Sequence, residues 1–121
     1  MPRKIELTLP VPPSVNRIWR RAKHGGMYKV KQAAAFDAAV LAAWVKAKLP
    51  RLPFPDGPVR YVLRWYRHPA KGDTSNRIKV IEDALNGLAW TDDEQVVDLR
   101  VIREDVGKGK QRMTITIEAA E

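Results

Sequence analysis

Two groups of prolines divide this chain and limit where regular structure can form. The first group lies within residues 10–13 and follows a segment in which Ile5, Leu7 and Leu9 alternate with polar residues. The second group lies within residues 50–58. Because proline lacks a backbone N–H and clashes with the preceding helical turn, a strand must end before the first group and a helix before the second. The alternation therefore predicts a short, half-buried first strand.

The segments between and after the prolines are also periodic. Residues 31–48 carry a helical apolar stripe, which consists of Phe36, Val40, Ala43, Trp44 and Ala47. Residues 59–67 alternate as a strand with one apolar face and one mixed face. Residues 96–102 and 112–118 predict two more strands, which are joined by the basic tip 107–110.

A second helix is predicted to begin at about residue 73. Projection at about 100° per residue places its apolar residues in one arc, formed by Ile78, Ile81, Leu85 and Leu88. The neighbouring arc is polar and contains Ser75, Asn76, Lys79, Glu82 and Asp83. Asn86-Gly87 is a typical helix end, because glycine readily takes the left-handed cap conformation. Four strands and two main helices in 121 residues predict an α/β (α+β) fold with a single domain.

Charge is distributed unevenly along the chain. Residues 1–71 carry 15 Lys and Arg against 3 acids, whereas residues 72–121 carry 7 against 11, so net charges of +12 and −4 give the chain's +8. A basic surface attracts polyanions, but carboxylates beside a phosphate backbone repel it unless they hold a cation. The pattern favours metal-dependent chemistry on nucleic acid, and solvated loops or helix caps are the alternative explanation of the acids.

The acids of interest lie in two short segments, residues 73–79 and 90–96. The first segment opens the second helix and the second precedes a strand, so the two groups can converge in the fold. Asp73 begins an Asp-Thr-Ser string that is typical of a helix N-cap. Capping alone therefore remains an alternative to a chemical role for Asp73.

The composition excludes several classes of site. The chain has no cysteine, so it has no disulfide framework, no thiolate metal site and no cysteine nucleophile, and only His24 and His68 offer imidazole. A metal must then be held mainly by oxygen, which favours Mg²⁺ or Mn²⁺ over zinc. No segment approaches the roughly 20 apolar residues that span a bilayer, and the N-terminus lacks an apolar signal core. We expect a cytoplasmic protein without membrane association.

In their order and spacing, these segments resemble the RusA family of Holliday junction resolvases, which are Mg²⁺-dependent endonucleases that cut four-way DNA. The resemblance covers nearly the whole chain and rests on residues 9–16, 31–48, 73–85 and 90–98. It implies a mixed β-sheet of about four strands packed with the two helices. It also implies a homodimer, a branched-DNA partner and a prokaryotic or phage-encoded origin.

The resemblance also implies roles for individual residues. The family motif Asp-x-Asp-Asn-x-x-Lys supplies two acids and a lysine, and an Asp-Asp pair before a strand supplies a third acid. The implied catalytic residues are Asp73, Lys79 and Asp93, with Asp73 and Asp93 as Mg²⁺ or Mn²⁺ ligands. Arginine and tryptophan in residues 12–21 suit phosphate contacts and base stacking, although ordinary loops carry them too. The expected nucleic-acid contacts are Asn16, Arg17, Arg20, Arg21, Asn76 and Arg77.

One position departs from the family motif. Ser75 stands where the motif has its second acid, and a neutral hydroxyl is a weaker metal ligand that removes one negative charge. Glu82 shares the helical face of Ser75 but lies about 10 Å further along the axis, so we expect no direct replacement from it. Asp92 is the expected substitute ligand.

The implied function is Mg²⁺-dependent hydrolysis of DNA phosphodiesters at Holliday junctions in recombination and repair, with Lys79 adding positive charge at the transition state. Three alternatives remain open. A RusA-like protein that has lost cleavage through Ser75 would bind branched DNA as a structural or regulatory module. A nuclease with another substrate preference is the second alternative. The third is an unrelated RNA-binding protein, whose expected aromatic strand motif is absent from the sequence.

Overall fold

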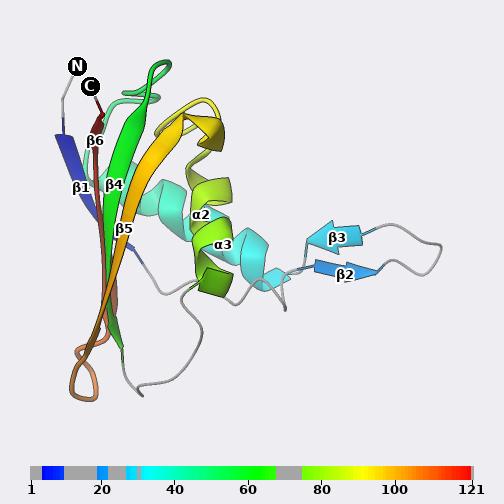
Figure 1. Cartoon of the computed structure of the whole chain (residues 1–121). Helices are drawn as coiled ribbons and strands as arrows, with labels where there is room; N and C mark the ends of the chain where they lie inside the picture. Colours follow the sequence, from blue (N-terminus) through cyan, green and yellow to red (C-terminus); the bar gives the residue numbers. More distant parts are fainter. Residues whose placement is uncertain (1–3, 10–18, 22–26, 30, 68–74, 121) are drawn as a thin grey trace.

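A computed structural model describes residues 4–9, 19–21, 27–29, 31–67 and 75–120. Its elements are, in chain order, β1 (Lys4–Leu9), β2 (Trp19–Arg21), β3 (Met27–Lys29), α2 (Lys31–Lys46), β4 (Val59–Arg67), α3 (Ser75–Leu85), the 3₁₀ helix η1 (Asp93–Gln95), β5 (Val96–Asp105) and β6 (Arg112–Ala119). Four strands form one mixed sheet in the order β1-β6-β4-β5, and β2 pairs with β3 apart from it (Figure 1). The predicted small α+β domain is confirmed.

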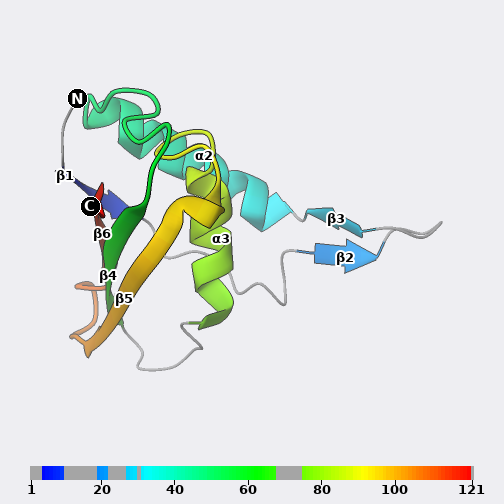
Figure 2. The ribbon, with the colours of Figure 1, turned by 45° about the horizontal axis from the view of Figure 1, so that its top comes forward.

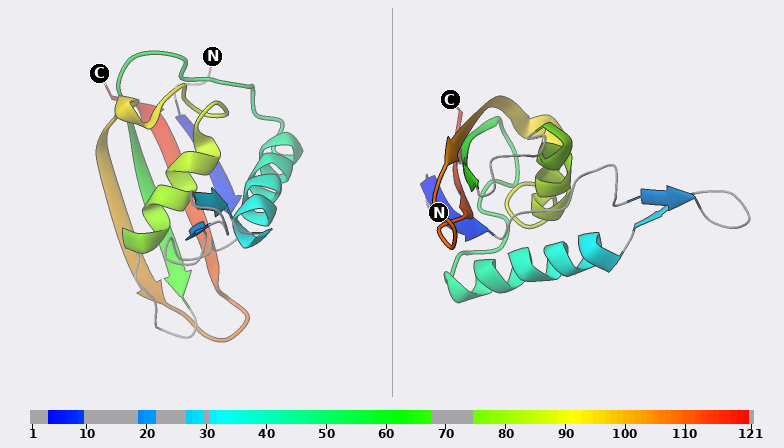
Figure 3. Two further views of the ribbon diagram at one scale, coloured as in Figure 1. Left: turned by 90° about the vertical axis from the view of Figure 1, so that its right-hand side faces the viewer. Right: turned by 90° about the horizontal axis from the view of Figure 1, so that it is seen from below.

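The sheet combines antiparallel and parallel pairs. β6 lies between β1 and β4 and is antiparallel to both, whereas β5 is parallel to β4. A parallel pair needs a crossover connection, and α3 lies in the segment that joins β4 to β5. Both helices cover the same face of the sheet, and the described part of the chain places no helix on the other face (Figures 2 and 3). No described helix is long and apolar enough to cross a membrane.

The hydrophobic core lies between the sheet and the two helices. Each sheet strand but β5 contributes alternate residues, and those of β4 are Val59, Tyr61, Leu63 and Trp65. The helices contribute Phe36, Val40, Trp44, Val80, Ile81 and Leu85. The strand periodicity predicted from sequence is therefore confirmed in β1, β4 and β6.

Three details of the helices differ from the predictions. Ala47, expected in the buried stripe, is exposed because α2 ends at Lys46. Val80 is buried although it lies outside the predicted stripe, whereas Ile78 and Leu88 are only half-buried. The physical reason is that α3 packs against α2 as well as facing the sheet, and this second contact rotates and widens its buried arc.

A two-stranded hairpin projects from the body of the molecule. Residues 19–21, predicted as loop, form β2 and pair with β3 in antiparallel register, with Trp19 opposite Lys29 and Arg21 opposite Met27. The loop prediction was therefore wrong for these three residues. The sequence does contain a weak hairpin signal, since the five residues between the two strands include two glycines, and connections of this length with glycine are common in hairpins. The hairpin extends away from the sheet and helices (Figure 1).

Gly87 provides a testable contribution to the end of α3. Its φ is +81°, and its N–H donates to the Trp90 carbonyl at 2.6 Å. An added Cβ would meet no heavy atom within 4 Å, so backbone conformation alone determines the cost of a side chain. We expect Gly87→Ala to lower the free energy of unfolding by about 1 kcal/mol, because a left-handed backbone disfavours a Cβ.

Urea denaturation measures this effect, and Gly107→Ala is the matched control. Gly107 also has open space around its Cβ position, but its φ lies outside the left-handed region. The control should therefore be neutral or slightly stabilising. An equal loss in the two variants would contradict the explanation from backbone conformation.

Candidate active site

A compact turn between α3 and β5 holds the Asp-Asp pair. Trp90 is completely buried, and its ring stacks on Tyr61 with centroids 6.0 Å apart. The Trp90 indole N–H donates to Asn86 Oδ1 at 2.6 Å, which ties the turn to the end of α3. These contacts explain why two polar acids follow a core residue: the tryptophan anchors the turn and the acids emerge from it.

Asp92 and Gln95 form a capping box on η1. The Asp92 carboxylate accepts the Glu94 N–H at 3.1 Å, and Gln95 Oε1 accepts the Asp92 N–H at 3.1 Å. The Gln95 amide also donates to the carbonyls of Phe54 and Gly57, both at 3.0 Å. Asp92 thus has a structural role as an N-cap, and its expected role as a metal ligand stays a prediction.

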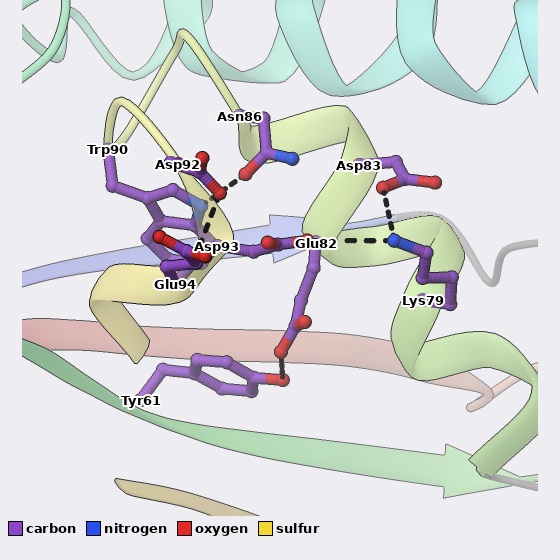
Figure 4. A network of polar contacts seen from close by, with 9 residues as sticks. All are labelled: Tyr61, Lys79, Glu82, Asp83, Asn86, Trp90, Asp92, Asp93 and Glu94. Carbon is purple, nitrogen blue, oxygen red and sulfur yellow. Dashed lines mark hydrogen bonds and ion pairs between the residues drawn. The ribbon is translucent and has the colours of Figure 1, made fainter. Parts of the chain in front are cut away.

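Lys79 lies between two carboxylates from different elements (Figure 4). Its Nζ is 3.2 Å from Asp83 Oδ1 on α3 and 3.6 Å from Asp93 Oδ2 at the start of η1. The hydrogen bond and negative charge of Asp83, followed by the charge of Asp93, raise the pKa of Lys79. The fold therefore brings Lys79 and Asp93 together and keeps the ammonium charged at neutral pH.

Glu82 is a fourth charged residue at this place, and it was not among the predicted site residues. Tyr61 Oη donates to Glu82 Oε2 at 2.6 Å. Burial raises the pKa of Glu82 and outweighs the opposing effect of the Tyr61 hydrogen bond, and the negative charge of Asp93 adds to the rise. Burial, followed by the hydrogen bond to Glu82, raises the pKa of Tyr61 beyond its usual range.

The raised pKa of Glu82 predicts a pH-dependent difference in stability. A carboxyl group whose pKa is raised by folding binds its proton more tightly in the folded state, so it lowers stability as pH rises through the folded pKa. Glutamine has no charge to desolvate and still accepts a hydrogen bond from Tyr61. We expect Glu82→Gln to become progressively more stable than wild type as pH rises above the ordinary glutamate value.

Urea denaturation of both proteins from about pH 4 to about pH 8 measures this difference. Glu94→Gln, which removes a charge from an exposed position on η1, controls for the general loss of a negative charge. A difference between Glu82→Gln and wild type that stays constant with pH would show that burial of Glu82 has no effect on its titration.

The remaining predicted site residues are placed only in part. Asn16, Arg17 and Asp73 lie outside the described residues. The backbone of β2 includes Arg20 and Arg21, and the first turn of α3 includes Ser75 and Asn76. Arg77 follows in α3, with its guanidinium carbon 4.9 Å from the centroid of the Trp65 ring. Within the described ranges, no three Asp, Glu, His or Cys side chains are grouped closely enough to hold a metal ion.

Comparison with known protein families addresses the identity of this site. The sequence profile described as Endodeoxyribonuclease RusA matches residues 10–118, which is almost the whole chain. The chain belongs to the RusA family. No curated protein sequence matches it. RusA is a family of endodeoxyribonucleases, and membership supports a nuclease activity for this chain.

The RusA assignment confirms the resemblance found in the sequence. Two of the three residues to which that resemblance gives catalytic roles, Lys79 and Asp93, lie 3.6 Å apart in this RusA fold. The sequence placed Glu82 and Asp83 on the same polar side of the helix as Lys79, because they lie three and four residues after it. It assigned neither of them to the site, and the contacts of Glu82 with Tyr61 and of Asp83 with Lys79 come from the structure.

Proposed function

We propose that this RusA-family chain is a Mg²⁺-dependent endodeoxyribonuclease that resolves four-way DNA junctions in recombination and repair. The observation that supports the proposal most directly is the contact between Lys79 and Asp93. It places a charged ammonium beside a carboxylate in a chain of net charge +8 that belongs to a family of DNA nucleases. A phosphodiester is an anion that such an ammonium attracts, whereas a carboxylate alone would repel it.

The proposed metal ligands are Asp73 and Asp93, with Asp92 as a further candidate. The donor chemistry fits Mg²⁺ or Mn²⁺, because Asp93 offers carboxylate oxygen and the described neighbourhood contains neither thiolate nor imidazole. The side chain of Asp93 is 27% exposed, so a solvent-borne cation has access to it. When bound, a divalent cation would supply an activated water and neutralise charge that develops on the phosphate.

Lys79 has the second role in the proposed reaction. Its side chain is 60% exposed, and its ammonium has three N–H donors that can reach phosphate oxygens. A lysine ammonium is charged throughout the physiological range, and the neighbouring carboxylates of Asp83 and Asp93 raise the pKa of Lys79 further. We assign to Lys79 the stabilisation of negative charge that grows on the phosphate in the transition state.

Branched DNA is the proposed partner. The net charge of +8 supplies the general attraction to a polyanion. The projecting hairpin carries Trp19, Arg20 and Arg21 on β2, residue types that stack on bases and bind phosphates. We also propose a homodimer, because two sites related by a two-fold axis would match the symmetry of a four-way junction.

A junction cleavage assay tests the proposal. Purified protein is incubated with a synthetic four-way junction, with and without Mg²⁺, and a linear duplex of the same sequence is the control substrate. We expect paired nicks in the junction only when Mg²⁺ is present, and little cutting of the duplex. Tight junction binding without cleavage would instead support the alternative of a DNA-binding module, which the neutral Ser75 in the acid motif favours.

A further inference from the structure

Lys79 needs a partner that holds its flexible side chain in place. A lysine has four rotatable side-chain bonds, and at 60% exposure the rest of the protein restricts this one little. Asp83 lies one helical turn further along α3, with its carboxylate oxygen 3.2 Å from Nζ. The pair has lysine N-terminal to the acid, the less favourable order for helix stability. Support of the helix is therefore a poor explanation of this contact.

The other two nearby carboxylates have different partners. Glu82 is half-buried and accepts the Tyr61 hydroxyl at 2.6 Å. Asp93 is the proposed metal ligand and lies further from Nζ, at 3.6 Å. Asp83 differs from both, because the described part of the structure gives it no hydrogen bond or ion pair except that with Lys79. Its side chain is only 23% exposed, so its own position is well restricted.

We propose that Asp83 is a positioning residue that holds the Lys79 ammonium beside the site. The inference rests on the proposed nuclease function and adds a residue that the acid motif does not contain. When Asp93 is engaged by a cation, Asp83 remains to keep the ammonium near the phosphate. Asp83 itself touches neither substrate nor reacting atom in this role. Its contribution therefore depends entirely on Lys79.

A double-mutant cycle tests this dependence. Asp83→Asn is made in the wild-type protein and in Lys79→Ala, and single-turnover junction cleavage is measured for all four proteins. We expect Asp83→Asn to slow cleavage about tenfold in the wild type, with junction affinity unchanged or tighter. In the Lys79→Ala background, which we expect to be about a hundredfold slower, the same change should have no further effect. Asp83→Glu should recover part of the rate.

Two outcomes of the cycle would overturn the proposal. An equal loss in both backgrounds would show that Asp83 acts independently of Lys79, as a metal ligand or a structural residue. Wild-type cleavage by Asp83→Asn would show that Lys79 needs no anchor. Glu94→Gln, which removes an exposed acid on η1, controls for the loss of one negative charge. Thermal unfolding of each variant identifies losses that arise from misfolding.

Nuclear magnetic resonance provides a readout that needs no cleavage. The side-chain ¹⁵N signal of Lys79 reports the mobility of its ammonium, and Lys79→Ala identifies that signal. We expect restricted motion in the wild type and free motion in Asp83→Asn. Restricted motion that persists in Asp83→Asn would overturn the positioning role. If the wild-type protein cuts no junction while the Lys79 ammonium still becomes mobile in Asp83→Asn, the proposed nuclease function is overturned and the positioning role is not.

Discussion

Asp93→Asn should slow junction cleavage by roughly a thousandfold or more, while junction binding stays intact or becomes tighter. The substitution removes a carboxylate that is proposed to hold the metal and that lies 3.6 Å from the Lys79 ammonium. Asparagine has nearly the same shape, so the turn that carries the residue should be preserved. Binding should not weaken, because the variant has one negative charge fewer to repel the phosphate backbone.

Single-turnover cleavage and a binding titration on the same four-way junction measure the two effects separately. The matched control is Glu94→Gln, which removes an adjacent acid of the same 3₁₀ helix and should cut at a rate close to wild type. If Asp93→Asn cuts normally, the assignment of the site is wrong. A parallel loss of binding and cleavage would place Asp93 in DNA recognition instead of metal binding.

Trp90→Ala should be the most destabilising single substitution proposed for this fold, with a loss of about 3–5 kcal/mol in the free energy of unfolding. The side chain is completely buried, stacks on Tyr61 and donates a hydrogen bond to Asn86. Truncation would leave a large cavity and an unpaired amide oxygen at the end of α3. Because Trp90 also anchors the turn that carries Asp93, cleavage should fall together with stability.

Urea denaturation measures the loss, and Val97→Ala is the control. Val97 is the second residue of β5 and follows the same turn, but it is 64% exposed, so its truncation should change stability by about 0.5 kcal/mol or less. Trp90→Phe should fall between the two, because it keeps a ring against Tyr61 but lacks the donor to Asn86. A small effect of Trp90→Ala would mean that the turn is held mainly by its capping contacts.

The sequence predicted those elements in which buried and exposed residues alternate regularly along a short segment. In β1 and β4, apolar residues alternate with more polar ones because one face of the sheet is buried. This pattern lies within each segment, so both strands were predicted with nearly correct bounds. Val80 was missed because the buried arc of α3 depends on its contact with α2, which no pattern within the helix contains. β2 was missed because three residues are too few to show a period.

The site was predicted less completely than the fold, for a related reason. Lys79 and Asp93 were named through family resemblance, and the structure brings them together. Glu82 appeared as an exposed-side helix residue and Tyr61 as a core residue, so nothing in either segment suggested their hydrogen bond. That pairing depends on how α3 is rotated on the sheet, which is a property of the tertiary structure. Asp92 was predicted as a metal ligand because of its charge, and the structure adds that its side chain caps the N-terminus of η1.

The position of β6 has a consequence for how the protein is made. β6 is the last of the four main-sheet strands in sequence order, yet it lies inside the sheet and pairs with both β1 and β4, with Lys4 opposite Glu118. During synthesis, β1 leaves the ribosome first and has no neighbour in the sheet until β6 follows it. Such long-range pairing slows folding, and an incomplete chain exposes unpaired strand edges that favour aggregation. The main sheet can therefore be completed only once β6 has left the ribosome, and until then β1 and β4 lack the strand that pairs with both of them.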